Sequence, residues 1–336
     1  TRSRVVTGVQ TCALPIYYVM LDNIHYINKP GGKKAKGIVG SRNYIHDFTP
    51  EQLAWLKKDL ELITDKSTPI VIGVHAPIYR YKNGMKGKIN ISISEPSASE
   101  FTALLRPFQN VHILSGHAHR NRTTYAAEDK SQPEIANIID HNIVAVSGSL
   151  WYSSGFGGPM LGSLGEPAGC KIFTIDDKDI KWYFNPTQLP AKEQFRCFDM
   201  NAVRDYFKSN GEARVFFDKF PDRTDYAKWE VDNAVMIHVW DWANDWKIKV
   251  TENGKELKVV RKKAESPQML IGLDLPNTLW LHKFDKKNNK RKMHPHMFHV
   301  VTSAPNTTVE VTVTDRFGNE YHQTMERPKP FSVHMK

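Results

Sequence analysis

The stretch Val111-His112-Ile113-Leu114-Ser115-Gly116-His117-Ala118-His119 joins a short apolar run to two histidines that are one residue apart. An apolar run of this length, bounded by turn residues, is typical of a strand buried on both faces of a sheet. The same order occurs earlier, where the apolar run 70–74 (IVIGV) ends directly in His75. Each run follows a stretch of helical periodicity, and this repeated order of helix, buried strand and histidine predicts an α/β fold.

The first of the two helices has a clear amino-terminal signal. Thr49 stands at the N-cap position, Pro50 at the first helical position, and Gln52 three residues after Thr49 completes a capping box. Apolar residues then follow at helical spacing and form one face: Leu53, Leu56, Leu60 and Ile63. The second helix is marked by a similar set: Phe101, Leu104, Leu105 and Phe108.

Three histidines follow the carboxyl ends of the two predicted strands. Ligands in open α/β sheets bind at the carboxyl ends of strands, so His75, His117 and His119 should converge if the strands are neighbours. Imidazole suits zinc, manganese, iron or nickel, and Gly116 would allow the backbone to pass close to an ion. From the residues alone, a metal site and an ordinary pair of loop histidines are both open.

The rest of the first domain contains a further buried strand at 142–146 and a hairpin formed by 171–175 and 180–184. Between them lies a glycine-rich loop in which Trp151 and Tyr152 are candidates for lining a substrate cleft. The alternative is that these two aromatic residues pack under the loop. Asn185-Pro186 and Pro190 mark a linker.

The carboxyl-terminal part is predicted to be a β-sandwich. Segments 235–242, 246–252 and 309–314 alternate, and Asn253-Gly254 is a strong hairpin signal. The domains we expect are 17–186, a linker and helical connection at 187–228, and the sandwich at 229–336. Two further sites are hypotheses: a carbohydrate platform, against simple aromatic packing, at Trp240, Trp242 and Trp246; and a second metal site at His294, His296 and His299.

Composition excludes some classes of function. The formal charge is +10, but the basic residues form scattered patches without interleaved aromatic residues, so we expect no nucleic-acid partner. A positive field could attract anionic substrates such as phosphate esters. No apolar run is long enough to span a membrane, and the three cysteines have no metal-ligand spacing.

Residues 1–16 (TRSRVVTGVQTCALPI) show neither helical nor strand periodicity, nor the pattern of a signal peptide. They resemble the translated read-through of a sequencing adapter, and a genuine irregular segment is the alternative. On the first interpretation, native sequence starts near Tyr17, inside a domain.

Four motifs in order resemble one family. They are Leu21-Asp22, the helix segment 52–56 (QLAWL), His75-Ala76-Pro77 and the Gly-His-x-His motif at 116–119. Together they make 17 to about 187 similar to the carboxyl-terminal half of calcineurin-like metallophosphoesterases, an α/β/β/α sandwich. The remainder resembles the carboxyl-terminal domain attached to such enzymes in Bacteroidetes-type bacteria, with 315–318 (DRFG) as the shared element.

The resemblance implies a dinuclear phosphoesterase. His75 and His117 would bind one ion and His119 the other, with Mn, Fe, Zn or Ni as the metals. Such a pair of ions generates a hydroxide nucleophile and stabilises in-line displacement at phosphorus. The implied substrate is a small phosphate ester. The resemblance also implies a periplasmic or secreted protein, with the cytoplasm as the alternative.

This chain departs from the family pattern in its upstream motifs. Asp-x-His, Gly-Asp-x-x-Asp and Gly-Asn-His with a following acid do not occur, so the bridging carboxylate and the acid/base histidine have no counterpart here. Asp22 is read as structural. Neutral imidazoles compensate two dications poorly. We therefore expect an amino-truncated enzyme of low activity, with no catalytic residue of its own; the alternative is a non-catalytic module that binds a glycan or a protein.

Overall fold

The computed structural model describes residues 16–26, 44–82, 87–147, 160–187, 189–282 and 293–334. These residues form two compact units. Unit 1 contains the described residues up to Ala118, together with Arg122–Ile143 and Phe173–Lys181. Unit 2 contains His119–Asn121, Val144–Ile172 and the described residues from Trp182 onward. The prediction of an α/β region followed by a β-rich region is confirmed.

Unit 1 is built on a five-stranded sheet with the order β1-β4-β7-β9-β8. The first four strands are parallel and the last is antiparallel. Their bounds are β1 Tyr17–Met20, β4 Ile70–Gly73, β7 Val111–Ser115, β9 Ile138–Asn142 and β8 Arg122–Tyr125. Unit 1 also contains two separate two-stranded hairpins. One pairs β2 (Ile24–Tyr26) with β3 (Tyr44–His46), and the other pairs β5 (Tyr79–Tyr81) with β6 (Ile89–Ile91). β4 and β7 are adjacent, which meets the condition under which their histidines should converge.

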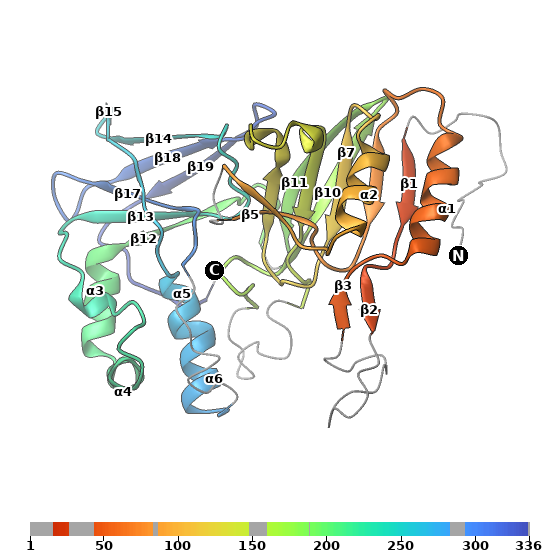
Figure 1. Ribbon diagram of the computed structural model, residues 1–336. Coiled ribbons are helices and arrows are strands. Elements are labelled where there is room, and N and C mark those ends of the chain that lie inside the picture. Colours follow the sequence, from red (N-terminus) through yellow and green to blue (C-terminus); the bar gives the residue numbers. More distant parts are fainter. Residues whose placement is uncertain are drawn as a thin grey trace. The chain divides into compact units, whose positions relative to one another are not determined.

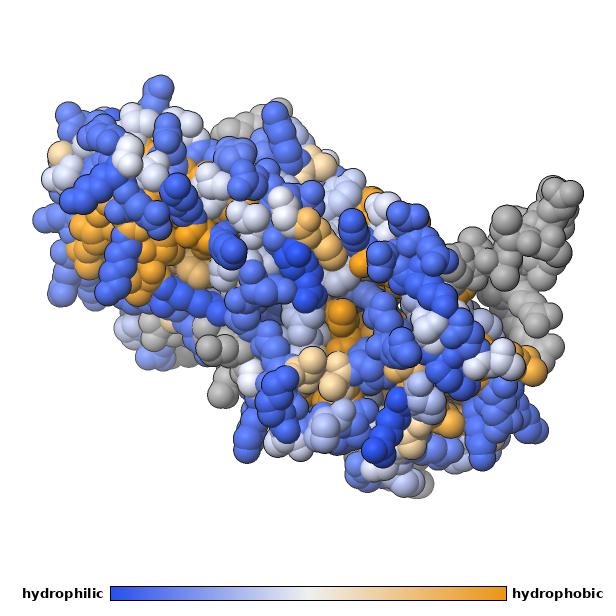
Figure 2. Space-filling model, turned by 90° about the horizontal axis from the view of Figure 1, so that it is seen from above, coloured by the Kyte–Doolittle hydropathy of each residue, from blue (hydrophilic) through white to orange (hydrophobic). Residues whose placement is uncertain are grey.

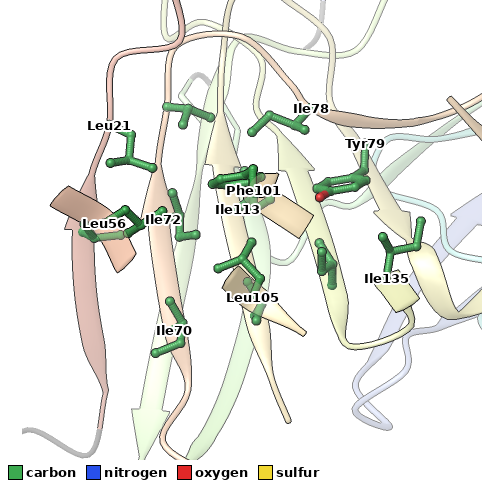
Figure 3. Packing of buried hydrophobic residues seen from close by; sticks show 14 of the residues in the cluster. Leu21, Leu56, Ile70, Ile72, Ile78, Tyr79, Phe101, Leu105, Ile113 and Ile135 are labelled. Atoms are coloured by element: carbon green, nitrogen blue, oxygen red, sulfur yellow. The ribbon is translucent and has the colours of Figure 1, made fainter. Parts of the chain in front are cut away.

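Helices α1 (Pro50–Glu61) and α2 (Ser97–Leu105) lie together on one face of this sheet, as Figure 1 shows. Leu56 and Phe101 bring the helices against Ile72 and Ile113 of the central strands (Figure 3). All four side chains are essentially inaccessible to water, and burial of this kind is the main contribution to the stability of the unit. Two 3₁₀ turns, η1 Ala126–Glu128 and η2 Pro133–Ile135, lie beyond β8.

The start of α1 differs from a full capping box. The Thr49 hydroxyl accepts the backbone N–H of Gln52 at 3.2 Å, as predicted. The Gln52 carboxamide, however, pairs with the backbone of Asp22 in both directions, each at 2.9 Å. The glutamine therefore ties the helix to the segment after β1 instead of returning to Thr49. Only half of the predicted box is present.

The predicted hairpin after the glycine-rich loop consists of β10 (Gly169–Asp176) and β11 (Asp179–Pro186). Its turn end belongs to unit 1. There the Phe173 ring meets the His141 ring edge-on at 5.1 Å, and Lys178 reaches Asp65 at 2.7 Å. The turn end of the hairpin therefore contacts unit 1 through one half-buried ring and one exposed ion pair.

Unit 2 contains two four-stranded sheets, ordered β12-β13-β17-β16 and β15-β14-β18-β19. The bounds in the first are β12 Phe195–Asp199, β13 Ala234–Val239, β17 Met297–Val301 and β16 Val260–Arg261. In the second they are β15 Lys255–Glu256, β14 Lys247–Glu252, β18 Val309–Thr314 and β19 Glu320–Met325. Alternate residues such as Val235, Ile237, Val250 and Val311 form a shared core, which is the packing of a β-sandwich.

Helices cover the other face of the β13 sheet, where Ala234, Met236 and Met297 pack against them. Their bounds are α3 Met200–Ser209, α4 Gly211–Lys219, η4 Tyr226–Lys228, α5 Pro267–Met269, the π-helix η5 Leu270–Asp274 and α6 Leu275–Leu279. The segment from α5 to α6 lies inside the region expected to be all β. Gly272 and Pro276 interrupt its periodicity, so its helical signal is weak.

No helix in the part of the chain that the structure describes is long and apolar enough to cross a bilayer. Figure 2 shows one face on which hydrophilic residues predominate, with smaller apolar patches between them.

Substitutions at two glycines with positive φ, Gly165 and Gly254, separate the effect of packing from that of backbone strain in unit 2. Gly165 has φ +93° and a Cβ added there would lie 2.4 Å from Cβ of Ser266, whereas at Gly254 (φ +75°) nothing lies within 4 Å. We expect Gly165→Ala to lower the free energy of unfolding by about 3 kcal/mol, because backbone strain and overpacking add. Gly254→Ala carries only the strain, about 1 kcal/mol. Urea unfolding of both variants checks this, and equal losses would contradict it.

Candidate functional site

His75 and His117 come together at the carboxyl edge of the unit 1 sheet. His75 follows β4 and His117 follows β7, which pair in parallel register. Nε2 of His75 lies 2.9 Å from Nδ1 of His117, and the ring centroids are 4.9 Å apart. His75 is exposed and His117 is half-buried, so the pair faces solvent. The structure therefore brings together two of the three predicted ligands.

The backbone strain in this motif falls on the histidines and not on the glycine. His117 has φ +59° and His119 has φ +52°, whereas Gly116 is outside the left-handed region. The expectation that Gly116 supplies unusual torsions is therefore wrong. Left-handed backbone at non-glycine residues is uncommon and costs roughly 1–2 kcal/mol each, and such strain concentrates at functional sites. The N–H of Gly116 donates to the carbonyl of His75 at 3.0 Å, which joins the two loops directly.

The buried side chain of Asp140 forms hydrogen bonds to both histidine-bearing loops. Oδ2 of Asp140, on β9, accepts the backbone N–H groups of Ile78 and Tyr79 at 2.9 and 2.8 Å, just after the His75 loop. Oδ1 accepts the hydroxyl of Ser115, which precedes Gly116, at 3.3 Å. Burial raises the pKa of the Asp140 carboxyl to about 7, although these hydrogen bonds lower it. Asp140 thus holds the two histidine-bearing loops in one arrangement.

Two carboxamides complete this support. Asn23 is fully buried; its Nδ2 donates to the carbonyl of Ala76 at 2.7 Å and its Oδ1 accepts the N–H of Ala76 at 3.0 Å. Asn142 donates from Nδ2 to the carbonyl of Gly116. Each histidine loop is therefore fixed by a side chain from another strand or connection. Sequence reasoning missed these residues because only the fold shows which backbone groups they reach.

His119, the third predicted ligand, belongs to unit 2. Its carbonyl accepts the N–H of Ser163 at 3.1 Å, and the Arg120 guanidinium donates to the Ser163 hydroxyl at 3.2 Å. The buried Glu166 carboxylate accepts the N–H groups of Asn121 at 2.9 Å and of Leu164 at 3.0 Å. This carboxylate fixes the segment that follows His119. The candidate cleft residues Trp151 and Tyr152 lie outside the described residues.

His46 joins the pair in unit 1, and the sequence analysis did not single it out. Its ring lies 5.0 Å from that of His117 and perpendicular to it, and Tyr44 stacks on His46 at 5.8 Å. Burial lowers the pKa of His46, and the charges of Arg80 and His75 lower it further. The imidazole is therefore neutral at pH 7. The alternation of Tyr44 and His46 was a visible signal, but nothing in it located the hairpin beside His117.

The donor chemistry fits one metal ion in unit 1. Nε2 of His75 and Nδ1 of His117 form a hydrogen bond of 2.9 Å, which shows that the two rings reach the same place, and imidazole is a ligand of zinc, manganese, iron and nickel. Among the described residues, no group of three or more His, Cys, Asp or Glu side chains is arranged as a metal site. The residues present therefore fit a single ion held by two imidazoles better than a pair of ions.

The second metal hypothesis gains no support from unit 2. His294 and His296 are buried with ring centroids 5.0 Å apart, and His238 lies 4.3 Å from His294. Nδ1 of His294 accepts the N–H of His296 at 3.0 Å, so the neutral ring carries its proton on Nε2 and offers no lone pair there. His299 packs against Trp229. Burial lowers the pKa of His238 to about 3, which keeps this core imidazole neutral.

The tryptophans of unit 2 pack instead of forming a platform. β13 ends at Val239, so Trp240 and Trp242 follow the strand and do not share its face as expected. Trp240 is buried against Phe184, and Trp242 lies 4.6 Å from Phe298 and 6.2 Å from Trp246. The packing alternative is the one that the structure supports.

The carboxyl-terminal part of the chain matches a known family. The family described as the C terminal of calcineurin-like phosphoesterase matches residues 140–321. The match begins in β9 and includes most of unit 2, so the candidate ligands His75, His117 and His119 precede it. No curated protein matches the chain. Because the matched range covers more than half of the sequence and includes most of the two sheets of unit 2, the chain belongs to the family described as the C terminal of calcineurin-like phosphoesterase.

Proposed function

We propose that this protein is a metal-dependent hydrolase of phosphate monoesters or diesters, with His75 and His117 as ligands of one divalent cation. The observation that carries the proposal is the 2.9 Å approach of Nε2 of His75 to Nδ1 of His117 at the carboxyl edge of a parallel sheet. The family and the net charge of +10 support it, because a positive field favours anionic substrates.

The chain's own residues have separate tasks in this proposal. When bound, a divalent cation supplies Lewis-acid activation of a phosphoryl oxygen and of water. His75 and His117 hold the ion, and Asn23 and Asp140 orient their loops, as outer partners do in metal sites. His119 lies in unit 2, where its carbonyl accepts the N–H of Ser163, and it has no part in holding this ion.

The charge balance predicts low turnover by this chain. Both imidazoles are neutral ligands, and no third His, Cys, Asp or Glu completes a metal-binding group with them among the described residues. A second dication would therefore meet uncompensated repulsion from the first. We expect one ion per chain and slow hydrolysis. Rapid metal-dependent hydrolysis of an aryl phosphate, abolished in His117→Ala, would contradict this expectation.

Metal binding is the direct test. We expect calorimetric titration of the full chain with Mn²⁺ or Zn²⁺ to show one site, and His117→Ala to weaken it at least about 100-fold, because even the loss of an outer partner costs about 10–100-fold. His322→Ala is the matched control, since His322 is an exposed imidazole on β19. Equal affinities for the wild type and His117→Ala would overturn the proposed site.

The alternative of a glycan-binding module receives no comparable support. That alternative followed from the absent upstream motifs, and the tryptophans considered as a carbohydrate platform do not add to it, because Trp240 and Trp242 are buried.

A further inference from the structure

The β2–β3 hairpin presents one of its faces to the histidine pair. Its register pairs Ile24 with His46 and Tyr26 with Tyr44, so these side chains share a face. The rings of Tyr26 and Tyr44 lie 5.8 Å apart, as expected for a cross-strand pair. His25 pairs with Ile45 on the opposite face. The hairpin therefore carries two imidazoles that face in opposite directions.

The hairpin is anchored to the loop that carries His75. Asn23, directly before β2, accepts the N–H of Asp47 with its carbonyl at 3.2 Å, which closes the base of the hairpin. The side chain of the same residue clamps Ala76 in both directions. One buried asparagine thus fixes the position of His46 relative to His75. Figure 1 shows the hairpin beyond the carboxyl end of β1.

His46 is placed as a neighbour of the metal-binding pair and not as a member of it. Its ring packs perpendicular to His117 at 5.0 Å, with Tyr44 stacked behind it. Among the residues that the structure describes, no three such side chains are arranged as a metal site. The His46 side chain is half-buried, so part of it is accessible to solvent.

We propose that His46 donates a hydrogen bond to the phosphoryl group of the substrate at the His75–His117 pair. This assignment rests on the proposed function and deepens it by naming a residue that contacts the substrate. An imidazole ring carries at least one N–H donor in either protonation state, and hydrogen bonds to phosphoryl oxygens are stronger than those between neutral groups.

The test is the binding of inorganic phosphate to the full chain by calorimetry, with Mn²⁺ present and after its removal by a chelator. We expect His46→Ala to weaken phosphate binding about tenfold, the value of one hydrogen bond to a charged group. His46→Gln retains an N–H donor and should stay within about threefold of the wild type. His25→Ala, on the other face of the hairpin, should leave phosphate binding unchanged. Circular dichroism melting verifies that each variant folds.

The outcomes separate this proposal from the proposed function. Unchanged phosphate affinity in His46→Ala overturns the assignment, as does the absence of phosphate binding to the wild type under both conditions. A loss of Mn²⁺ affinity in His46→Ala as large as the loss of phosphate affinity also overturns it, because His46 would then be a metal ligand. If the wild type binds no Mn²⁺, the proposed function fails, and the metal-free titration still decides the role of His46.

Discussion

Replacing Arg223 by alanine should lower the free energy of unfolding of unit 2 by about 3–5 kcal/mol, one of the two largest effects we expect. The Arg223 side chain is fully buried and donates to Glu265 at 2.8 Å and to Asp274, whose side chains are also fully buried. Glu265 in turn accepts the N–H of Thr224 at 2.8 Å. Removing the guanidinium leaves the Glu265 and Asp274 carboxylates buried in the core without the cation that both of them contact.

Arg204 supplies the matched control for this prediction. It pairs with Asp232 at 2.6 Å, but the Asp232 side chain is 71% exposed. Exposed ion pairs contribute about 0–1 kcal/mol, so Arg204→Ala should change stability little. Chemical denaturation with a fluorescence signal from the tryptophans of unit 2 measures both variants. Similar small losses at Arg204 and Arg223 would show that the buried network does not stabilise the fold as its geometry indicates.

Asp140→Ala should destabilise unit 1 by about 3 kcal/mol and weaken metal binding at the same time. The substitution removes the acceptor for the buried N–H groups of Ile78 and Tyr79, and each unsatisfied group costs about 1–3 kcal/mol. It also removes the acceptor of the Ser115 hydroxyl, which directly precedes the loop that carries His117. Because outer partners orient metal ligands, we expect Mn²⁺ affinity to fall about 10–100-fold. Denaturation and calorimetry of one preparation check both effects.

Asp140→Asn is the conservative variant, since its carboxamide oxygen can still accept both N–H groups. Asp140→Asn cannot titrate, so a comparison of its stability with that of the wild type across pH reports the titration of the Asp140 carboxyl. The folded pKa of about 7 lies above the usual value of 3.8, so the folded state holds an extra proton between pH 4 and 7. The stability contributed by that proton is complete below pH 4 and is lost as the pH rises through 7. The wild type should therefore lose stability relative to Asp140→Asn across this range; parallel pH profiles would refute this.

The parts of the fold that follow from local pattern were predictable. Apolar runs long enough for one buried strand predicted β4 and β7, and Thr49 with Pro50 predicted the start of α1. Asn253 and Gly254 have positive φ, as the hairpin signal required. The segment from α5 to α6 was missed because Gly272 and Pro276 interrupt its pattern, and its helical form depends on packing in the core of unit 2.

For the candidate site, the sequence alone determined that His75 and His117 follow buried strands of an α/β sheet, because strand ends are set by local chemistry. Tertiary structure alone decided that β4 and β7 pair and that His46 reaches His117 from a separate hairpin. It also decided that the Asp140 carboxylate lies under both loops. These contacts join residues that are distant along the chain. No periodicity encodes them, since they depend on strand order and on which buried backbone groups need partners.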